Sequence, residues 1–439
     1  MIELYEPQKK AVEKQIEALT NYNAALCTAN TGTGKTLMAL ETAKAMGLVP
    51  LICCPIAASA TFRRWSDELS IPVLDIINIE KLRTGKTPYV SLSGSAKKGQ
   101  FTWNLDRTKH LVIIDEAHRS ITGSTSISGR MCCMLRPQGI KTLLLTATPP
   151  ATPLGLRNIG YLCRLHQYST SDFFNWCRRH GAVPSPFHRG LIFDVGTPKA
   201  KRAMEQINQA LQPVLTKVTV EDLKDNFGEN IVQTLYVNLS EDDTGRVQAI
   251  YDELSEELKK KNHDNPLVSQ LRARQKTELL KIPALFDAVV DLLDEEYSVF
   301  VCLCFKESVR QLAEMLRGHA VNMITGDLGE AERTSAVALF QADMTRVLIA
   351  TAEAGGASIS LHNDREGQRK RTSLIVPHAS ASVFQQVLGR IYRAGGLTPA
   401  LQRIVIAANT PEVKIAKRLE AKINLINTLT DQDLWVDTD

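Results

Sequence analysis

Residues 28–40, TANTGTGKTLMAL, hold a lysine and a hydroxyl directly behind two closely spaced glycines. Glycine allows backbone N–H groups to close around phosphate oxygens, and lysine adds a cation to them. In this pattern Lys35 would contact the β- and γ-phosphates of a nucleotide, and the Thr36 hydroxyl would bind Mg²⁺. The residues that would surround the phosphates are Thr31, Gly32, Thr33, Gly34, Lys35 and Thr36. The sequence therefore predicts a P-loop, with Ala29 in place of its first glycine.

A phosphate loop of this kind also needs a carboxylate near the metal ion and a base near the attacking water. Residues 112–118, VIIDEAH, offer both at the end of an apolar run. Asp115 would hold Mg²⁺ through water, and Glu116 would orient or deprotonate the nucleophilic water. Another run, LLLTATPP at 143–150, ends in two hydroxyl groups. Thr146 and Thr148 would relay the state of the phosphate, or else cap the end of a strand.

Two arginines near the end of the chain could also reach a phosphate. In QVLGRIYRAGG, residues 386–396, Arg390 and Arg393 are three residues apart, so we expect them on one face of a helix. They could form an exposed basic patch, or they could bind the γ-phosphate of a nucleotide. Arginine suits the second role because its planar, permanently charged group matches the geometry of phosphate oxygens.

Short apolar runs precede these groups and must position them. The first third of the chain contains such runs at 23–29, 50–55, 110–118 and 141–150, and later runs lie at 297–305, 320–326, 345–352, 372–378 and 403–409. Apolar runs bounded by turn formers and separated by amphipathic stretches predict parallel strands buried between helices. We therefore expect an α/β protein with two lobes.

The part of the chain between these two sets of strands is richer in charge and in helical patterns. The predicted domains are a first lobe at 1–153, a helical insertion at 154–270, a second lobe at 271–412 and a C-terminal helix at 413–439. The insertion holds a basic and aromatic segment, DFFNWCRRHGAVPSPFHRG, at 172–190. Here Arg178 and Arg179 should face outward, whereas Phe173 and Trp176 could either pack in a core or stack on bases.

The composition adds a few limits. The 52 basic residues nearly balance 48 acidic ones, so any nucleic-acid site must be a local stripe of charge. The nine cysteines show no CxxC spacing, which argues against zinc and favours reduced, buried thiols. We see no signal peptide and no membrane-spanning run, so a cytoplasmic or nuclear location is expected.

Together the motifs resemble a known family. TGTGKT, DEAH, TATP and QxxGRxxR occur in the order typical of superfamily 2 helicases and translocases, which have two RecA-like lobes. The resemblance implies that ATP and Mg²⁺ are bound and that nucleic acid is the partner. It also implies that Lys35, Glu116, Arg390 and Arg393 carry out hydrolysis.

Further residues take their expected roles from the same resemblance. Gln8, in LYEPQ, would read adenine. The residues that would couple the nucleotide to nucleic acid are His118, Thr146, Thr148, Gly355, Gly356 and Gln386. The residues that would contact nucleic acid are Arg63, Arg64, Thr325, Arg178 and Arg179. The basic run at 369–371 is a further candidate, or a solvated loop.

Two subgroups are the most similar. Residues around 172–290 resemble Swi/Snf-type ATPases, and GGASISLHNDREGQRKRTSLIVPH resembles strawberry notch helicases, including phage and viral members. This chain departs from both, because it is shorter and has Tyr392 where a histidine is usual. The Swi/Snf likeness favours an ATP-dependent motor on duplex or branched DNA. An RNA helicase and an ATP-gated clamp without processive movement are the alternatives.

Overall fold

The computed structural model describes residues 3–95, 98–121, 126–185, 190–195, 197–259, 266–355, 359–414 and 417. The described chain divides into two compact units, of which unit 1 runs to Lys224 and unit 2 starts at Asp225. The predicted insertion at 154–270 is therefore shared between the two units. The predicted C-terminal helix lies almost entirely outside the described residues.

Unit 1 is built on a six-stranded sheet in which every neighbouring pair is parallel. The strands, in spatial order, are β10 (Leu215–Thr216), β1 (Ala24–Cys27), β7 (Lys141–Leu145), β6 (His110–Ile114), β2 (Val49–Cys53) and β3 (Asp75–Ile77). The central strands are buried along most of their length, as their apolar runs predict. Their carboxyl ends therefore meet at one edge of the sheet, where ligands bind in folds of this type.

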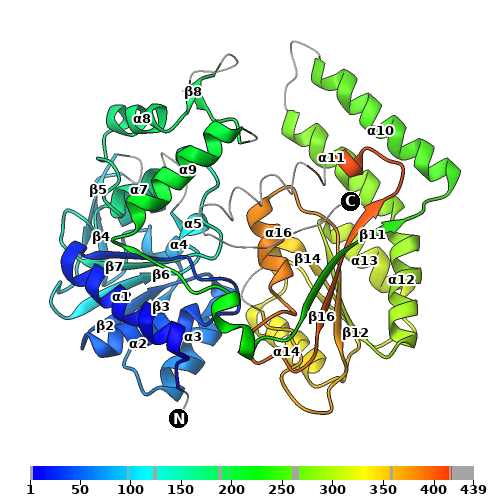
Figure 1. The fold of residues 1–439 in the computed structure, drawn as a ribbon, viewed down its shortest axis with the longest axis horizontal. Helices are drawn as coiled ribbons and strands as arrows, with labels where there is room; N and C mark the ends of the chain where they lie inside the picture. The colour runs from blue at the N-terminus through cyan, green and yellow to red at the C-terminus, as the bar shows by residue number, and fades with distance from the viewer. Residues whose placement is uncertain are drawn as a thin grey trace. The chain divides into compact units, whose positions relative to one another are not determined.

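Helices connect and cover these strands (Figure 1). The main ones are α1 (Glu6–Tyr22), α2 (Lys35–Ala45), α3 (Ile56–Glu68), α7 (Arg157–Leu162), α8 (Thr170–Arg179) and α9 (Pro198–Leu211). Shorter elements are α4 (Ile79–Leu82), α5 (Ala117–Ser120) and α6 (Ile127–Cys133), with the hairpins β4–β5 (Val90–Ser93, Gln100–Trp103) and β8–β9 (Val183–Pro184, Leu191–Ile192). Two 3₁₀ turns occupy Pro153–Leu156 and Glu221–Asn226.

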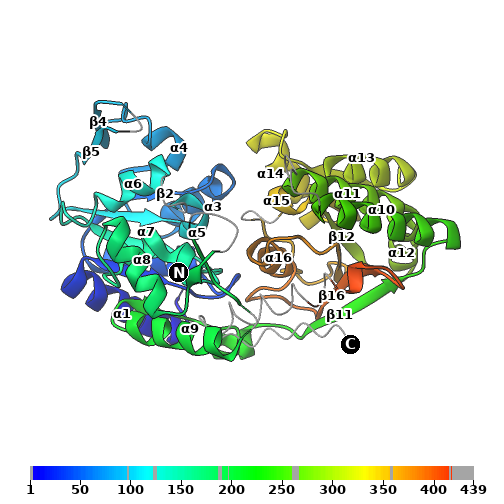
Figure 2. The same ribbon diagram turned by 90° about the horizontal axis from the view of Figure 1, so that it is seen from above.

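Unit 2 repeats the design with a second parallel sheet of six strands. The order is β11 (Asn230–Val237), β16 (Ala400–Ala407), β15 (Arg371–Ile375), β12 (Ser298–Leu303), β14 (Val347–Thr351) and β13 (Val321–Ile324). Its helices are α10 (Glu241–Lys259), α11 (Pro266–Leu280), α12 (Ile282–Asp294), α13 (Lys306–Met315), α14 (Glu330–Gln341), α15 (Ala352–Gly355) and α16 (Ala381–Leu388). Figure 2 shows α11, α12 and α13 beside one another, and apolar residues of α12 and α13 share a core with β12, β14 and β15.

The predicted fold class is confirmed: two α/β lobes with parallel, RecA-like sheets and additional helices. The sequence missed β10 and β11, which fall in the stretch expected to be helical. β10 has only two residues, and β11 is an edge strand with an alternating rather than continuous pattern of burial. Within the described ranges, no helix is both long enough and apolar enough to span a bilayer.

Candidate functional site

The P-loop connects the carboxyl end of β1 to the first turn of α2. Gly32 and Gly34 have φ angles of 85° and 90°, in the left-handed region that favours glycine. Lys35, the first residue of α2, turns back over the loop, where its Nζ donates to the carbonyls of Ala29 and Asn30, each at 2.9 Å. Phosphate oxygens would compete with these two carbonyls for the ammonium group. The loop therefore has the backbone shape and the cation that phosphate binding requires.

Gln8 holds the loop from the side of α1. Its Nε2 donates to the Thr33 carbonyl at 2.9 Å, and its Oε1 accepts from the Tyr5 backbone N–H at 2.9 Å. A Cβ added to Gly34 would lie 2.5 Å from Gln8 Nε2, so the glycine allows this close approach. Gln8 thus ties the start of α1 to the phosphate loop, and its role in reading adenine stays a prediction.

The chain after α9 supports the other side of the loop. The backbone N–H groups of Thr28 and Asn30 donate to the carbonyls of Thr216 and Val218, at 2.9 and 3.0 Å. The short strand β10 and the residues just after it, which the sequence did not reveal as a strand, thus brace the P-loop. This support is distant along the chain. Gln15 Nε2 also donates to Thr216 Oγ1 at 3.2 Å, across a separation of 201 residues.

Asp115 and Glu116 follow β6 at the same edge of the sheet. The Asp115 N–H donates to the Cys53 carbonyl at 2.8 Å, which extends the pairing of β6 with β2 by one residue. Glu116 then takes a left-handed conformation, with φ 48° and ψ 46°. Non-glycine residues in this region cost free energy, and they gather at functional sites. This turn sets the direction of the Glu116 carboxylate.

His118 brings together three groups that the sequence predicted to cooperate. Its Nδ1 lies 2.8 Å from Thr146 Oγ1 and 3.4 Å from Glu116 Oε2, and its Nε2 lies 3.3 Å from Thr148 Oγ1. Burial lowers the pKa of His118 to about 4, so the ring is neutral at pH 7. With its one proton on Nδ1, the ring would donate to Thr146 Oγ1, the nearer acceptor, and accept the Thr148 hydroxyl at Nε2, while the Glu116 carboxylate lies beside Nδ1. Thr146 and Thr148 thus both contact the His118 ring, and their role as a relay of the phosphate state stays a prediction.

The residues near this edge suit a Mg²⁺ ion that is shared with a nucleotide. Thr36 lies in the first turn of α2, after β1, and Asp115 follows β6. Over the described residues, no group of three or more His, Cys, Asp or Glu side chains could hold a metal alone. Mg²⁺ commonly takes one or two protein oxygens and completes its shell with phosphates and water. Thr36 and Asp115 fit that arrangement.

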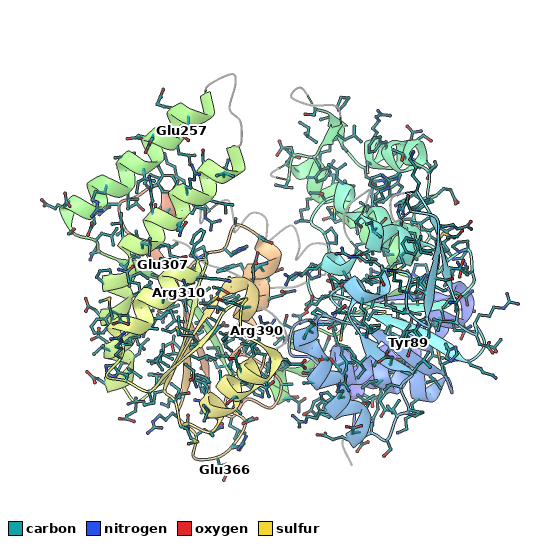
Figure 3. All side chains as sticks on the ribbon, turned by 180° about the vertical axis from the view of Figure 1, so that it is seen from behind. Tyr89, Glu257, Glu307, Arg310, Glu366 and Arg390 are labelled. Atoms are coloured by element: carbon teal, nitrogen blue, oxygen red, sulfur yellow. The ribbon has the colours of Figure 1, made fainter. Side chains whose placement is uncertain are left out.

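In unit 2, Arg390 and Arg393 lie in the segment after α16 and not on a helix, which corrects the sequence expectation. Because α16 ends at Leu388, the two side chains converge by the path of the loop, and both donate to the Ile359 carbonyl, at 3.1 and 2.8 Å. Arg390, labelled in Figure 3, is 2% exposed. Burial and the charge of Arg390 lower the pKa of Arg393 to about 9. An exposed basic patch is therefore excluded for this pair.

The other predicted coupling residues of unit 2 are close to these arginines in sequence or fold. Gln386 is on α16 and is 1% exposed. Gly355 ends α15, where an added Cβ would lie 2.7 Å from Ala350 Cβ and 3.3 Å from the Phe300 ring. A side chain at that position would push α15 away from the sheet. Gly356 lies outside the described residues.

The predicted nucleic-acid residues are placed mostly at the surface. Arg63 and Arg64 are exposed on α3, and Arg64 pairs with Glu68 at 2.6 Å. Arg178 and Arg179 are exposed at the end of α8. Thr325 follows β13. Hydrogen bonds from Thr325 and Lys306 lower the pKa of Asp327 to about 2.

Two expectations about basic and aromatic segments are settled by burial. Phe173 and Trp176 are 2% and 4% exposed and pack around His166, so they belong to the core of unit 1. In the basic run, Arg371 is buried at the start of β15, pairs with Asp343 at 2.6 Å and lies over the Phe340 ring. At Arg371 the run is thus neither a solvated loop nor a surface for nucleic acid, whereas Lys370 is exposed in the segment before β15.

The cysteines also match their expected state. All nine are free thiols, and all except Cys304 are buried. Burial raises the pKa of Cys53 and Cys302, which makes these thiols unreactive.

Comparisons with known proteins show which proteins this chain is similar to. No protein-family profile matches the chain. A protein of Acanthamoeba polyphaga mimivirus, named "Putative ATP-dependent RNA helicase", is 28% identical over 460 aligned positions, which cover 98% of this chain and 84% of the viral protein. Among solved structures, the helicase domain of Hef from Pyrococcus furiosus aligns with a TM-score of 0.48 and 13% identity, over 94% of this chain and 97% of that domain. The predicted relationship to superfamily 2 helicases is confirmed by the similarity in sequence.

Proposed function

We propose that this chain is a nucleic-acid-dependent ATPase of the helicase and translocase type. The observation that carries the proposal is the position of His118, whose ring is hydrogen-bonded to Thr146 and Thr148 and lies 3.4 Å from the Glu116 carboxylate. It links the residue that would activate water to a second strand end on the same sheet edge as the P-loop. A simple nucleotide-binding protein would not need such a link.

In the proposed reaction, the P-loop N–H groups and Lys35 hold the phosphates of ATP. Mg²⁺, held by Thr36 and Asp115, would neutralise charge on the β- and γ-phosphates. Glu116 orients the attacking water and accepts its proton, while His118 keeps the Glu116 carboxylate in place. Arg390 and Arg393 would stabilise the charge that develops on the γ-phosphate. The products are ADP and inorganic phosphate.

For the polymer, we propose duplex or branched DNA bound without sequence preference. The likeness of residues 172–290 to Swi/Snf-type ATPases supports this choice, and exposed arginines such as Arg63 and Arg179 suit phosphate contacts. The name of the viral relative favours RNA as the second candidate.

The test is ATP hydrolysis by the wild type and by Glu116→Gln with a panel of polymers. The panel comprises no polymer, single-stranded DNA, duplex DNA, a fork, a four-way junction and RNA. Stimulation by duplex or branched DNA that disappears in Glu116→Gln supports the proposal, and stimulation by RNA alone favours the second candidate. Glu13→Gln, at an exposed position of α1, is the matched control and should hydrolyse ATP at the wild-type rate. Equal hydrolysis with and without every polymer contradicts the proposal.

A second assay separates a motor from a clamp. A motor displaces a protein block or a third strand along DNA while ATP is hydrolysed, whereas a clamp only changes its affinity for DNA with the bound nucleotide. Displacement that requires hydrolysis, and fails with a non-hydrolysable ATP analogue, supports movement.

A further inference from the structure

The β4–β5 hairpin of unit 1 carries a concentration of positive charge that the proposed ATPase site does not use. Between Glu80 and Asp106 the chain has no acidic residue and five basic ones, namely Lys81, Arg83, Lys86, Lys97 and Lys98. The chain as a whole has 52 basic and 48 acidic residues, so this imbalance is local. A local excess of this kind creates a positive potential that attracts anions.

One face of the hairpin fixes it to unit 1. Phe101 and Trp103 of β5 are 2% and 4% exposed, and Val90 of β4 is fully buried. The Trp103 indole N–H donates to the Met131 carbonyl at 2.9 Å, and its backbone N–H donates to Gln138 Oε1 at 2.9 Å. The hairpin is therefore held on α6 and the turn that follows it, and its charges have a defined position.

The opposite face of the hairpin is polar and exposed. Ser91 pairs with Thr102 and Ser93 pairs with Gln100 in the antiparallel register, and all four side chains point away from the buried face. Hydroxyl and amide groups can donate hydrogen bonds to phosphate oxygens. Because the aromatic residues are on the buried face, they are not available to stack on bases.

Two lysines border this polar face. Lys86 is exposed and forms an isolated bridge with Ser91, and Lys98 is exposed just before β5. The turn before Lys86 is tight, since Gly85 has φ 65° and an added Cβ would lie 2.3 Å from Leu92 Cβ. This turn keeps Lys86 beside β4.

The chain leaves the carboxyl edge of the sheet at the end of β3 and reaches the hairpin through α4. α4 begins at Ile79, immediately after β3, and the Cys54 N–H donates to the Ile77 carbonyl at 3.1 Å where β2 and β3 end. Tyr89, labelled in Figure 3, hydrogen-bonds to Asp75 at the start of β3, and its pKa is raised mainly by burial. Figure 2 shows β4 and β5 projecting from one end of unit 1.

We propose that the polar face of the β4–β5 hairpin, with Lys86 and Lys98, binds the phosphate backbone of the nucleic acid on which the ATPase acts. The proposal rests on the proposed function, because it adds a second contact surface for the same polymer. Ammonium groups neutralise phosphates, and the hydroxyl groups between them fix the position of the backbone. With no exposed aromatic residue on this face, the contact is independent of base sequence.

The test is the salt dependence of duplex DNA binding by the double variant Lys86→Gln/Lys98→Gln. The slope of log affinity against log salt is negative, and each phosphate contact that is lost reduces its magnitude by about 0.9, so the slope of the variant should be shallower by about 1.8. The control Lys10→Gln/Lys14→Gln removes the same charge from exposed positions of α1 and should keep the wild-type slope. The variant Lys86→Arg/Lys98→Arg keeps the charge and should also keep the slope.

The outcomes separate this proposal from the proposed function. If duplex DNA stimulates wild-type ATP hydrolysis but the Gln variant and the α1 control have equal slopes, the hairpin does not bind the backbone and only this proposal is overturned. If the wild type neither binds nor responds to any polymer, both proposals are overturned. A slope reduced only in the hairpin Gln variant supports the hairpin contact.

Discussion

The ring of Tyr392 packs against the ring of Phe227, with 4.9 Å between their centroids. Phe227 also forms a bridge with Ala394, and the Gly395 N–H donates to the Asn226 carbonyl at 2.7 Å. Phe227 follows the boundary at Lys224, so the first residues of unit 2 are attached to the loop that carries Arg390 and Arg393. The tyrosine that replaces the usual histidine therefore has a packing role at this loop.

Phe227→Ala should loosen the attachment of the loop that carries Arg390 and Arg393. An aromatic pair contributes about 0.5–1.5 kcal/mol beyond its buried area, so we expect kcat for ATP to fall by roughly two- to tenfold. The KM for ATP should stay within about twofold, because the P-loop is untouched. Steady-state kinetics measures both. Phe227→Leu keeps apolar volume, so its kcat should lie between that of Phe227→Ala and that of the wild type. An unchanged kcat in Phe227→Ala would argue against a role of this aromatic pair in positioning the loop.

Removing an arginine of the pair should stop hydrolysis without preventing ATP binding. Arginines that act on the γ-phosphate raise kcat by a factor of about 10³–10⁵ in P-loop enzymes. We therefore expect Arg390→Ala and Arg393→Ala each to lower kcat for ATP hydrolysis by a factor of at least about 10³. ATP affinity, measured with a fluorescent analogue, should change far less. Arg317→Ala, at an exposed position of unit 2 that pairs with Glu314, is the control and should retain wild-type activity. Near-normal hydrolysis in both arginine variants would remove the pair from the mechanism.

Because His118 is buried, the free energy of unfolding should depend on pH between about pH 4 and 6.5. Its pKa is about 4 in the folded chain and near 6.5 in the unfolded chain, so the unfolded state binds the extra proton first. The stabilisation is complete above pH 6.5 and is lost as pH falls toward 4, by up to roughly 3 kcal/mol. Urea unfolding at several pH values measures this loss. His118→Gln should show a smaller loss than the wild type, and an identical pH dependence would disprove the burial of a neutral ring.

Gly34→Ala should damage the P-loop more than an equivalent change elsewhere. Gly34 and Gly47 both have positive φ, but a Cβ at Gly34 meets Gln8 at 2.5 Å whereas one at Gly47 meets nothing within 4 Å. Left-handed backbone costs an alanine about 1–2 kcal/mol, and that is the expected effect of Gly47→Ala on the free energy of unfolding. Gly34→Ala should lose more stability and should also weaken ATP binding by at least about tenfold. Calorimetric unfolding measures the stability, and ATP titration measures the affinity. Equal effects of the two variants would mean that the Gln8 side chain moves aside without cost.

Some features of this protein follow from local sequence. The P-loop is contiguous, so its glycines, Lys35 and Thr36 are recognisable without any tertiary contact. The buried central strands are also legible, because strands covered on both faces need continuous apolar runs. The order of motifs along parallel strands then predicts that Glu116, His118 and Thr146 meet, since parallel strands end at one edge.

Other features were decided only by the tertiary structure. β10 is two residues long and carries no strand pattern of its own, yet it braces the P-loop through pairing with β1. Arg371 looks like part of a surface run, but its pairing with Asp343 allows it to be buried. The packing of Phe227 on Tyr392 joins segments far apart in the chain. In each case the stabilising partner is distant in sequence, and only long-range packing and hydrogen bonding could select it.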